Sequence, residues 1–240
     1  MQTPAYKRVL LKLSGEALRN GAETILDFDY IDTVVAEIRR CVEAGVQIAL
    51  VIGAGNIWRG AKGTDVNRTR ADHMGMLATV INSIGMKDAL LRAGIDAHVM
   101  TPVAMETFTE PYLRDRAVEY LEQGSVVILS CGSGAPFFST DTAAVLRAAE
   151  LDCDVTLMAK NIDAVYTADP RKDPTAKPLP LIDYMHILDN HLTAIDITAT
   201  AFAMENQLSI HIFGLNDPAN IFKVIMGEKL GTIVKGGANK

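Results

Sequence analysis

Residues 46–60 read VQIALVIGAGNIWRG, an apolar run of strand length that leads directly into a glycine-rich turn. A continuous apolar run of this length is typical of a strand buried on both faces of a sheet. Arg8–Leu13 is a second strand candidate, and a helical apolar face lies between the two. That face consists of Ile31, Val34, Val35, Ile38 and Val42. A strand, a helix and a second strand in this order predict a parallel pair joined by a crossover helix.

The same alternation continues along the chain. Further strands are predicted at 95–100, 125–130, 154–159, 209–213 and 231–234. Helical patterns are centred on 74–84, 111–122, 140–151 and 198–206. We therefore predict an α/β fold with a mainly parallel central sheet covered by helices on both faces.

Composition excludes several classes of protein. The chain has 240 residues, and 23 Lys+Arg against 29 Asp+Glu give a net charge of −6, which argues against bulk binding to nucleic acid. No apolar run reaches the ~18 residues of a membrane helix, and Lys12 interrupts the apolar amino-terminal segment too early for a signal peptide. The three cysteines match no metal-binding spacing. We expect a cytoplasmic protein without nucleic-acid or membrane partners.

Three predicted strands end in glycine-rich turns, and ligands bind at the carboxyl ends of strands in such sheets. The turns are 12–16 (KLSGE), 53–60 (GAGNIWRG) and 131–138 (CGSGAPFF). Glycine lets backbone amides approach a phosphate closely. Because Lys12 and Arg59 lie in two of these turns, we predict a polyphosphate site.

The two common phosphate-binding motifs are absent from these turns. A dinucleotide fingerprint beginning at Gly53 or Gly132 requires glycine where the chain has Trp58 or Phe137. A Walker loop ending at Gly60 requires lysine where the chain has Ala61. The chain therefore fits neither the Rossmann nor the P-loop pattern.

Five segments resemble, in order, those of bacterial uridylate kinases of the amino-acid-kinase superfamily, and the resemblance extends from about Lys7 to Val234. The segments are 12–18 (KLSGEAL), 53–60, 72–79 (DHMGMLAT), 133–141 and 166–170 (YTADP). The resemblance implies a three-layer α/β/α sandwich of about eight strands, formed by a single domain over 1–240. The amino-terminal part would hold mainly the acceptor, UMP, and the carboxy-terminal part mainly ATP.

The resemblance also implies an activity. The γ-phosphoryl group of ATP would pass to UMP to give UDP and ADP, in pyrimidine nucleotide biosynthesis. Magnesium, Mg²⁺, would be carried by ATP rather than by protein ligands. The family forms cytoplasmic homohexamers that GTP activates and UTP inhibits.

By position, the resemblance implies three sets of site residues. The catalytic set is Lys12, Arg59, Lys160 and Asp141, the last orienting the lysines. The ATP set is Lys12, Leu13, Ser14, Gly15, Gly55, Arg59, Asn161, Tyr166 and Asp169. The UMP set is Ala54, Asp72, Ser133, Gly134, Ala135, Pro136, Phe137, Phe138, Ser139 and Thr140, with Asp72 placed for the ribose.

These residue types also suit the chemistry. A phosphate monoester is largely dianionic near neutral pH, with a second pKa of about 6, so it is already a nucleophile and requires no general base. What the reaction needs is positioning and cations.

Several residues also have structural interpretations. Asp72 and Asp141 are each candidates for a helix N-cap, and we assign Asp196 to capping the helix that follows it. We interpret Arg68 and Arg70 as solvated loop charges. The stripe of Met74, Met76 and Leu77 is predicted to pack in the core.

The chain departs from the family pattern at four places. Ala54, Ala135 and Ala164 replace the usual glycine, asparagine and glycine, and 20–26 (NGAETIL) lacks the usual Gly-Phe-Gly. Because that segment is linked to effector response in the family, we expect GTP to activate weakly or not at all.

Two other functions remain open at this stage. One is a kinase of the same superfamily with a carboxylate or carbamate acceptor. The other is a nucleotide-binding sensor or storage protein without catalysis.

Overall fold

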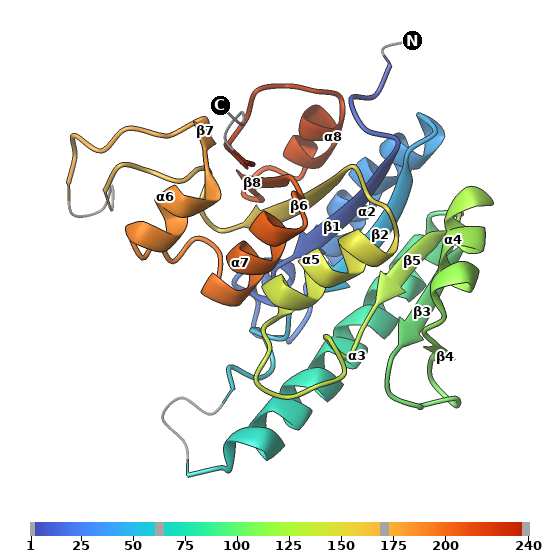
Figure 1. Cartoon of the computed structure of the whole chain (residues 1–240). Coiled ribbons are helices and arrows are strands. Elements are labelled where there is room, and N and C mark those ends of the chain that lie inside the picture. Colours follow the sequence, from blue (N-terminus) through green and yellow to red (C-terminus); the bar gives the residue numbers. More distant parts are fainter. Residues whose placement is uncertain (1–2, 61–64, 169–172, 237–240) are drawn as a thin grey trace.

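The computed structural model describes residues 3–60, 65–168 and 173–236. Within them the chain forms one sheet of nine strands in the order β4-β3-β5-β2-β1-β6-β8-β9-β7 (Figure 1). All neighbouring strands are parallel except β8 and β9. The strands are β1 (Arg8–Leu13), β2 (Gln47–Ile52), β3 (Ala97–Thr101), β4 (Glu110–Pro111), β5 (Val126–Leu129), β6 (Val155–Lys160), β7 (Leu181–Ile182), β8 (Ile210–Gly214) and β9 (Thr232–Val234).

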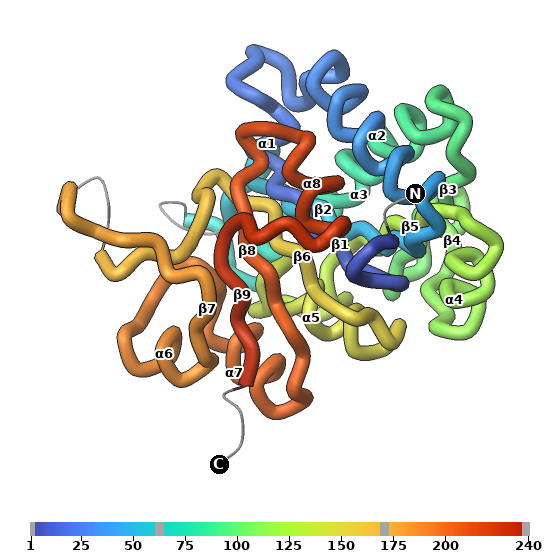
Figure 2. The backbone as a smooth tube through the Cα atoms, turned by 90° about the horizontal axis from the view of Figure 1, so that it is seen from above, coloured from blue at the N-terminus to red at the C-terminus, as the bar shows by residue number. Residues whose placement is uncertain are grey.

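Helices cover both faces of this sheet. They are α1 (Gly15–Arg19), α2 (Phe28–Glu43), α3 (Arg68–Arg92), α4 (Arg114–Glu122), α5 (Thr140–Glu150), α6 (Tyr184–Asp189), α7 (Ile197–Glu205) and α8 (Ala219–Ile225). Figure 2 shows α2, α3 and α8 on one side of the strands and α4, α5, α6 and α7 on the other. The predicted three-layer α/β/α arrangement is confirmed.

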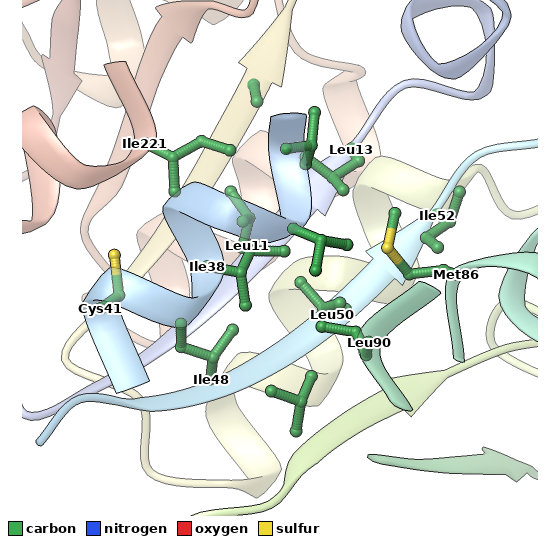
Figure 3. Packing of buried hydrophobic residues seen from close by; sticks show 14 of the residues in the cluster. Leu11, Leu13, Ile38, Cys41, Ile48, Leu50, Ile52, Met86, Leu90 and Ile221 are labelled. Carbon is green, nitrogen blue, oxygen red and sulfur yellow. The ribbon is translucent and has the colours of Figure 1, made fainter. Parts of the chain in front are cut away.

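The central strand β1 divides its side chains between the two layers. Val9, Leu11 and Leu13 are fully buried in the cluster that α2 and α8 complete, as Figure 3 shows for Leu11 and Leu13 beside Ile38 and Ile221. Leu10 belongs to the cluster on the opposite face. Each buried leucine contributes about 1.5–3 kcal/mol relative to an exposed one. Because side chains alternate along a strand, Lys12 points toward the same face as Leu10.

Five short elements lie outside the strands and helices predicted from the sequence. The strands β4 and β7 have two residues each, α1 has five, α6 has six and α8 has seven, so none is long enough for a clear periodicity. Helix α3 begins at Arg68, six residues before the apolar stripe. It begins there because the Asn67 side chain accepts hydrogen bonds from the amides of Thr69 and Arg70.

One prediction about α3 is wrong. Met74 and Leu77 were expected in the core, but their exposed fractions are 43% and 54%, and Met76 is half-buried. Ile81 and Ile84 continue the same outward stripe, with exposed fractions of 47% and 43%.

Among the described residues, no helix, α3 included, combines the length and the apolar character needed to span a bilayer.

Candidate active site

Two lysines come together where the central strands end. β1 and β6 are parallel neighbours, and Lys12 lies opposite Met158 in their register. Lys160 is the last residue of β6, two positions beyond Met158, so it points toward the same face of the sheet as Met158. Both ammonium groups therefore project toward the layer that contains α5.

Asp141 in the first turn of α5 joins the two lysines. Its Oδ1 lies 3.0 Å from the Lys12 Nζ, and its Oδ2 accepts a hydrogen bond of 2.6 Å from the Lys160 Nζ. The N-cap of α5 is Ser139, whose Oγ accepts from the amides of Asp141 and Thr142 at 3.0 and 3.1 Å. Asp141 is therefore not the N-cap, and its carboxylate is left to bridge the lysines.

This lysine–aspartate cluster, defined as Lys12, Asp141 and Lys160, is shielded from solvent. The exposed fractions of the three side chains are 10%, 12% and 17%. Burial alone would raise the pKa of Asp141, but the charges of Lys12 and Lys160 outweigh it and lower that pKa. Burial lowers the pKa of Lys160, and Asp141 opposes this effect. With all three groups ionised, the cluster carries one uncompensated positive charge.

The lysine–aspartate cluster borders a cavity that suits a phosphate chain. The cavity has a volume of about 290 Å³, and its lining includes Lys12, Ser14, Lys160 and Asn161. Four residues of the predicted ATP and catalytic sets thus meet at one place. The uncompensated positive charge of the cluster favours an anion there.

The lowered pKa of Lys160 predicts an alkaline limb in the pH profile of kcat/KM. If Lys160 acts as a catalytic cation it must be protonated, so activity should fall as pH rises through its pKa, which lies below the ordinary 10.5. In Lys160→Arg the guanidinium stays charged, so we expect the limb to move to higher pH. The substrates titrate identically with both enzymes. If the alkaline limbs of the wild type and of Lys160→Arg coincided, Lys160 would carry no essential proton.

The first and second glycine turns pack directly on each other. A Cβ on Gly15 would overlap the carbonyl oxygen of Gly53, so this close approach requires glycine. Buried Asn82 of α3 donates to the Gly53 carbonyl at 2.8 Å and pairs with Asn56 through both amide groups. Sequence reasoning missed Asn56 and Asn82. The available signal was an asparagine, Asn82, within the helical apolar pattern at 74–84.

Arg59 contacts the first two glycine turns. It forms an ion pair with Glu16, and its Nε donates to the Gly55 carbonyl at 3.4 Å. With an exposed fraction of 76%, its side chain extends into solvent. Both of these contacts lie in the first two glycine turns, and the catalytic role of Arg59 stays a prediction.

Asp72 ties the third glycine turn to α3. Its Oδ2 accepts from the Phe137 amide and from the Arg68 Nε, both at 2.8 Å. Burial alone would raise the pKa of Asp72, but these two partners lower it. Asp72 does not cap α3, since Asn67 does. Arg68 contacts both Asp72 and the Phe137 ring, 5.2 Å away, so it is not a merely solvated charge.

The third turn has an unusual backbone. Cys131 and Phe137 have positive φ of 65° and 73°, and Gly132 and Gly134 of 60° and 86°. The amide of Cys131 donates to the Thr79 Oγ1 at 2.8 Å, a second tie to α3. Residues 133–140 of the predicted UMP set thus follow one continuous loop into α5.

The remaining predicted residues lie at the carboxyl edge or outside the described residues. The Tyr166 hydroxyl donates to Asp163, which lines a second cavity of about 420 Å³ near the end of β8. Asp169 lies outside the described residues.

Within 3–60, 65–168 and 173–236, no three His, Cys, Asp or Glu side chains gather as metal ligands. That magnesium is carried by ATP stays a prediction.

Known proteins share this architecture. The sequence model of the amino acid kinase family matches residues 7–214. A UMP kinase from Bacillus anthracis is 34% identical, with a TM-score of 0.93 over 97% of each chain. A UMP kinase from Ureaplasma parvum is 32% identical, with a TM-score of 0.90 over 95% of this chain and 98% of that one. A uridylate kinase from Archaeoglobus fulgidus, 24% identical with a TM-score of 0.73 over 94% and 99%, shares the fold. Sequence and structure together show that the chain belongs to the amino acid kinase family.

Proposed function

We propose that this protein is a UMP kinase that transfers the γ-phosphoryl group of ATP to UMP in pyrimidine nucleotide biosynthesis. The observation that carries the proposal is the lysine–aspartate cluster, with two ammonium groups on one buried carboxylate beside the glycine turns. The names of the similar bacterial kinases support UMP as the acceptor.

The proposed mechanism relies on position and charge. The phosphate of UMP attacks as a dianion, so no side chain has to remove a proton. Lys12 and Lys160 stabilise the negative charge that develops on the transferred group, and Asp141 fixes where their ammonium groups lie. Magnesium, bound to ATP, supplies further positive charge.

The two substrates are assigned to different turns at the carboxyl edge of the sheet. We assign ATP to the carboxy-terminal side, with its phosphates at the cavity that Lys12, Ser14 and Lys160 line. We assign UMP to the loop 133–140, which the carboxylate of Asp72 ties to α3. Phe137 and Phe138 are 63% and 51% exposed, which suits stacking on a pyrimidine.

We also propose that α3 joins two copies of the chain, as a first interface of the homohexamer that the family resemblance implies. Met74, Leu77, Ile81 and Ile84 follow a spacing of three and four residues, which is typical of a helix that packs on another helix. A second copy presents the same stripe, so a twofold axis would bury the two apolar stripes against each other.

Leu77→Glu is expected to dissociate this pair. Each charged side chain would be buried without a partner, so the molar mass by light scattering should fall to that of a smaller species. Leu181→Glu is the matched control, because Leu181 is 55% exposed against 54% for Leu77 but lies on β7. If Leu77→Glu kept the same molar mass as Leu181→Glu, α3 would not be the interface.

Regulation and location complete the proposal. UTP is proposed as an inhibitor, and GTP as a weak activator or none, because 20–26 lacks the family's Gly-Phe-Gly. Because its substrates are intracellular nucleotides, we propose a cytoplasmic enzyme.

The experiment that tests the activity is an ADP-release assay with several acceptors. UMP as the best acceptor supports the proposal. Preference for acetylglutamate or carbamate would favour the carboxylate or carbamate kinase, and no turnover would favour the sensor or storage protein.

A further inference from the structure

Asp196 has a second set of contacts besides its capping role. As predicted, it is the N-cap of α7, where its Oδ1 accepts from the Ala199 amide at 2.8 Å. The same carboxylate also reaches across to α5. Its Oδ2 accepts from the Ser139 hydroxyl, and Thr142 Oγ1 lies 3.2 Å from both carboxylate oxygens.

The direction of the Ser139 hydrogen bond follows from counting its partners. The Ser139 Oγ already accepts from the amides of Asp141 and Thr142, so its single hydrogen is free for an acceptor. The carboxylate of Asp196 is nearer than the Thr142 Oγ1, which lies 3.5 Å away. Asp196 therefore fixes the hydroxyl that caps α5 at the turn containing Asp141.

The segment just before Asp196 holds the other side of the lysine–aspartate cluster. The carbonyl oxygen of Ala194 accepts a hydrogen bond from the Lys160 ammonium group. Residues 194–196 thus contact Lys160 through the backbone and the α5 cap through a side chain. This segment is a short connection between the two partners, Asp141 and Lys160, whose spacing the reaction requires.

We propose that Asp196 is a positioning residue, which sets the place of Asp141 relative to Lys160 through the Ser139 hydroxyl. This inference rests on the proposed kinase function. It assigns Asp196 no contact with either substrate. Capping α7 requires only one carboxylate oxygen of Asp196, Oδ1, whereas holding Ser139 at the same time requires Oδ2 as well.

Asparagine separates the two roles. Its single carbonyl oxygen can cap α7 at Ala199 or accept from Ser139, but its NH₂ group is a donor and cannot replace the second acceptor. Asparagine is also as good an N-cap as aspartate. Asp196→Asn therefore keeps the capping of α7 possible and removes the acceptor for the Ser139 hydroxyl, while Thr142 Oγ1 keeps an oxygen partner at residue 196.

The test compares Asp196→Asn with Asp183→Asn. Asp183 is the N-cap of α6 and accepts from the His186 amide at 2.7 Å, so it is a matched capping residue on another helix. In Asp196→Asn we expect kcat to fall about 10- to 100-fold with the KM for ATP within about threefold. Amide exchange in the first turn of α5 should also accelerate. Asp183→Asn should change neither quantity.

A double variant shows whether Asp196 acts through Ser139. Because both substitutions break one connection, Ser139→Ala combined with Asp196→Asn should lower kcat little further than the more impaired single variant. Independent, multiplying effects would overturn the proposal. So would wild-type kcat or unchanged α5 exchange in Asp196→Asn. If the wild-type enzyme made no UDP, the proposed function would fail, whereas the exchange measurement would still decide whether Asp196 holds α5.

Discussion

Lys12→Met is expected to lower kcat by about 10²-fold or more while the protein stays folded. The methionine keeps most of the volume of the lysine stem, so no large cavity forms, but the ammonium group beside Asp141 is lost. If that charge stabilises the transferred group in the transition state, the loss appears in kcat. Steady-state kinetics with both substrates saturating measure it directly.

The stability of the same variant identifies the role of Lys12. Asp141 keeps Lys160 as its partner at 2.6 Å, so Lys12→Met leaves no unpaired carboxylate. We expect the Tm to stay within about 4 °C, which corresponds to about 1 kcal/mol for a domain of this size. A variant that melts early but keeps its kcat would identify Lys12 as structural.

Asp141→Asn is expected to impair both activity and stability. It removes the anion between two buried ammonium groups, which are then held together without compensation. Removing one partner from a buried ion pair typically costs about 3–5 kcal/mol. We expect kcat to fall by about 10²-fold or more, because neither lysine keeps its position.

The stability of Asp141→Asn is expected to rise with pH. Without Asp141, the pKa of Lys160 falls further, since burial and Lys12 both disfavour its charge. Stability lost in this variant should therefore partly return as pH rises through the lowered pKa of Lys160.

The wild type should behave differently at low pH. The folded-state pKa of Asp141 is lowered, so the stability it provides is present above its unfolded pKa and lost as pH falls through the folded value. Urea denaturation curves of both proteins across pH test this contrast. If Asp141→Asn were as stable as Lys12→Met at every pH, the carboxylate would not organise the cluster.

The central part of the site was predictable because it depends on strand geometry. Lys12 is the last residue but one of the predicted strand Arg8–Leu13, and Lys160 directly follows the predicted strand at 154–159. Parallel strands place such positions at one edge of the sheet. The pattern alone singled out Lys12, whereas the family resemblance implied that Lys160 and Asp141 belong to the same site.

The contacts that position these groups were not predictable from spacing. Asp72 holds the Phe137 amide across 65 residues, and Asp196 holds Ser139 across 57. Which carboxylate caps a helix and which crosses to another element depends on the packing of α3, α5 and α7, and no local pattern encodes it. Similarly, the stripe of Met74 and Leu77 has the spacing of a core face. Only the packed structure shows that α3 turns it outward.

The central claim is that UMP accepts the phosphoryl group, and one assay tests it most directly. Purified protein with ATP and magnesium is given UMP, CMP, dUMP, GMP, acetylglutamate or carbamate, and kcat/KM for ADP release is compared, with Lys12→Met as the blank for contaminating kinases. We predict the highest kcat/KM for UMP by a wide margin, with activity abolished or strongly reduced in the variant. A higher value for acetylglutamate or carbamate, or equal turnover by Lys12→Met, would contradict the account.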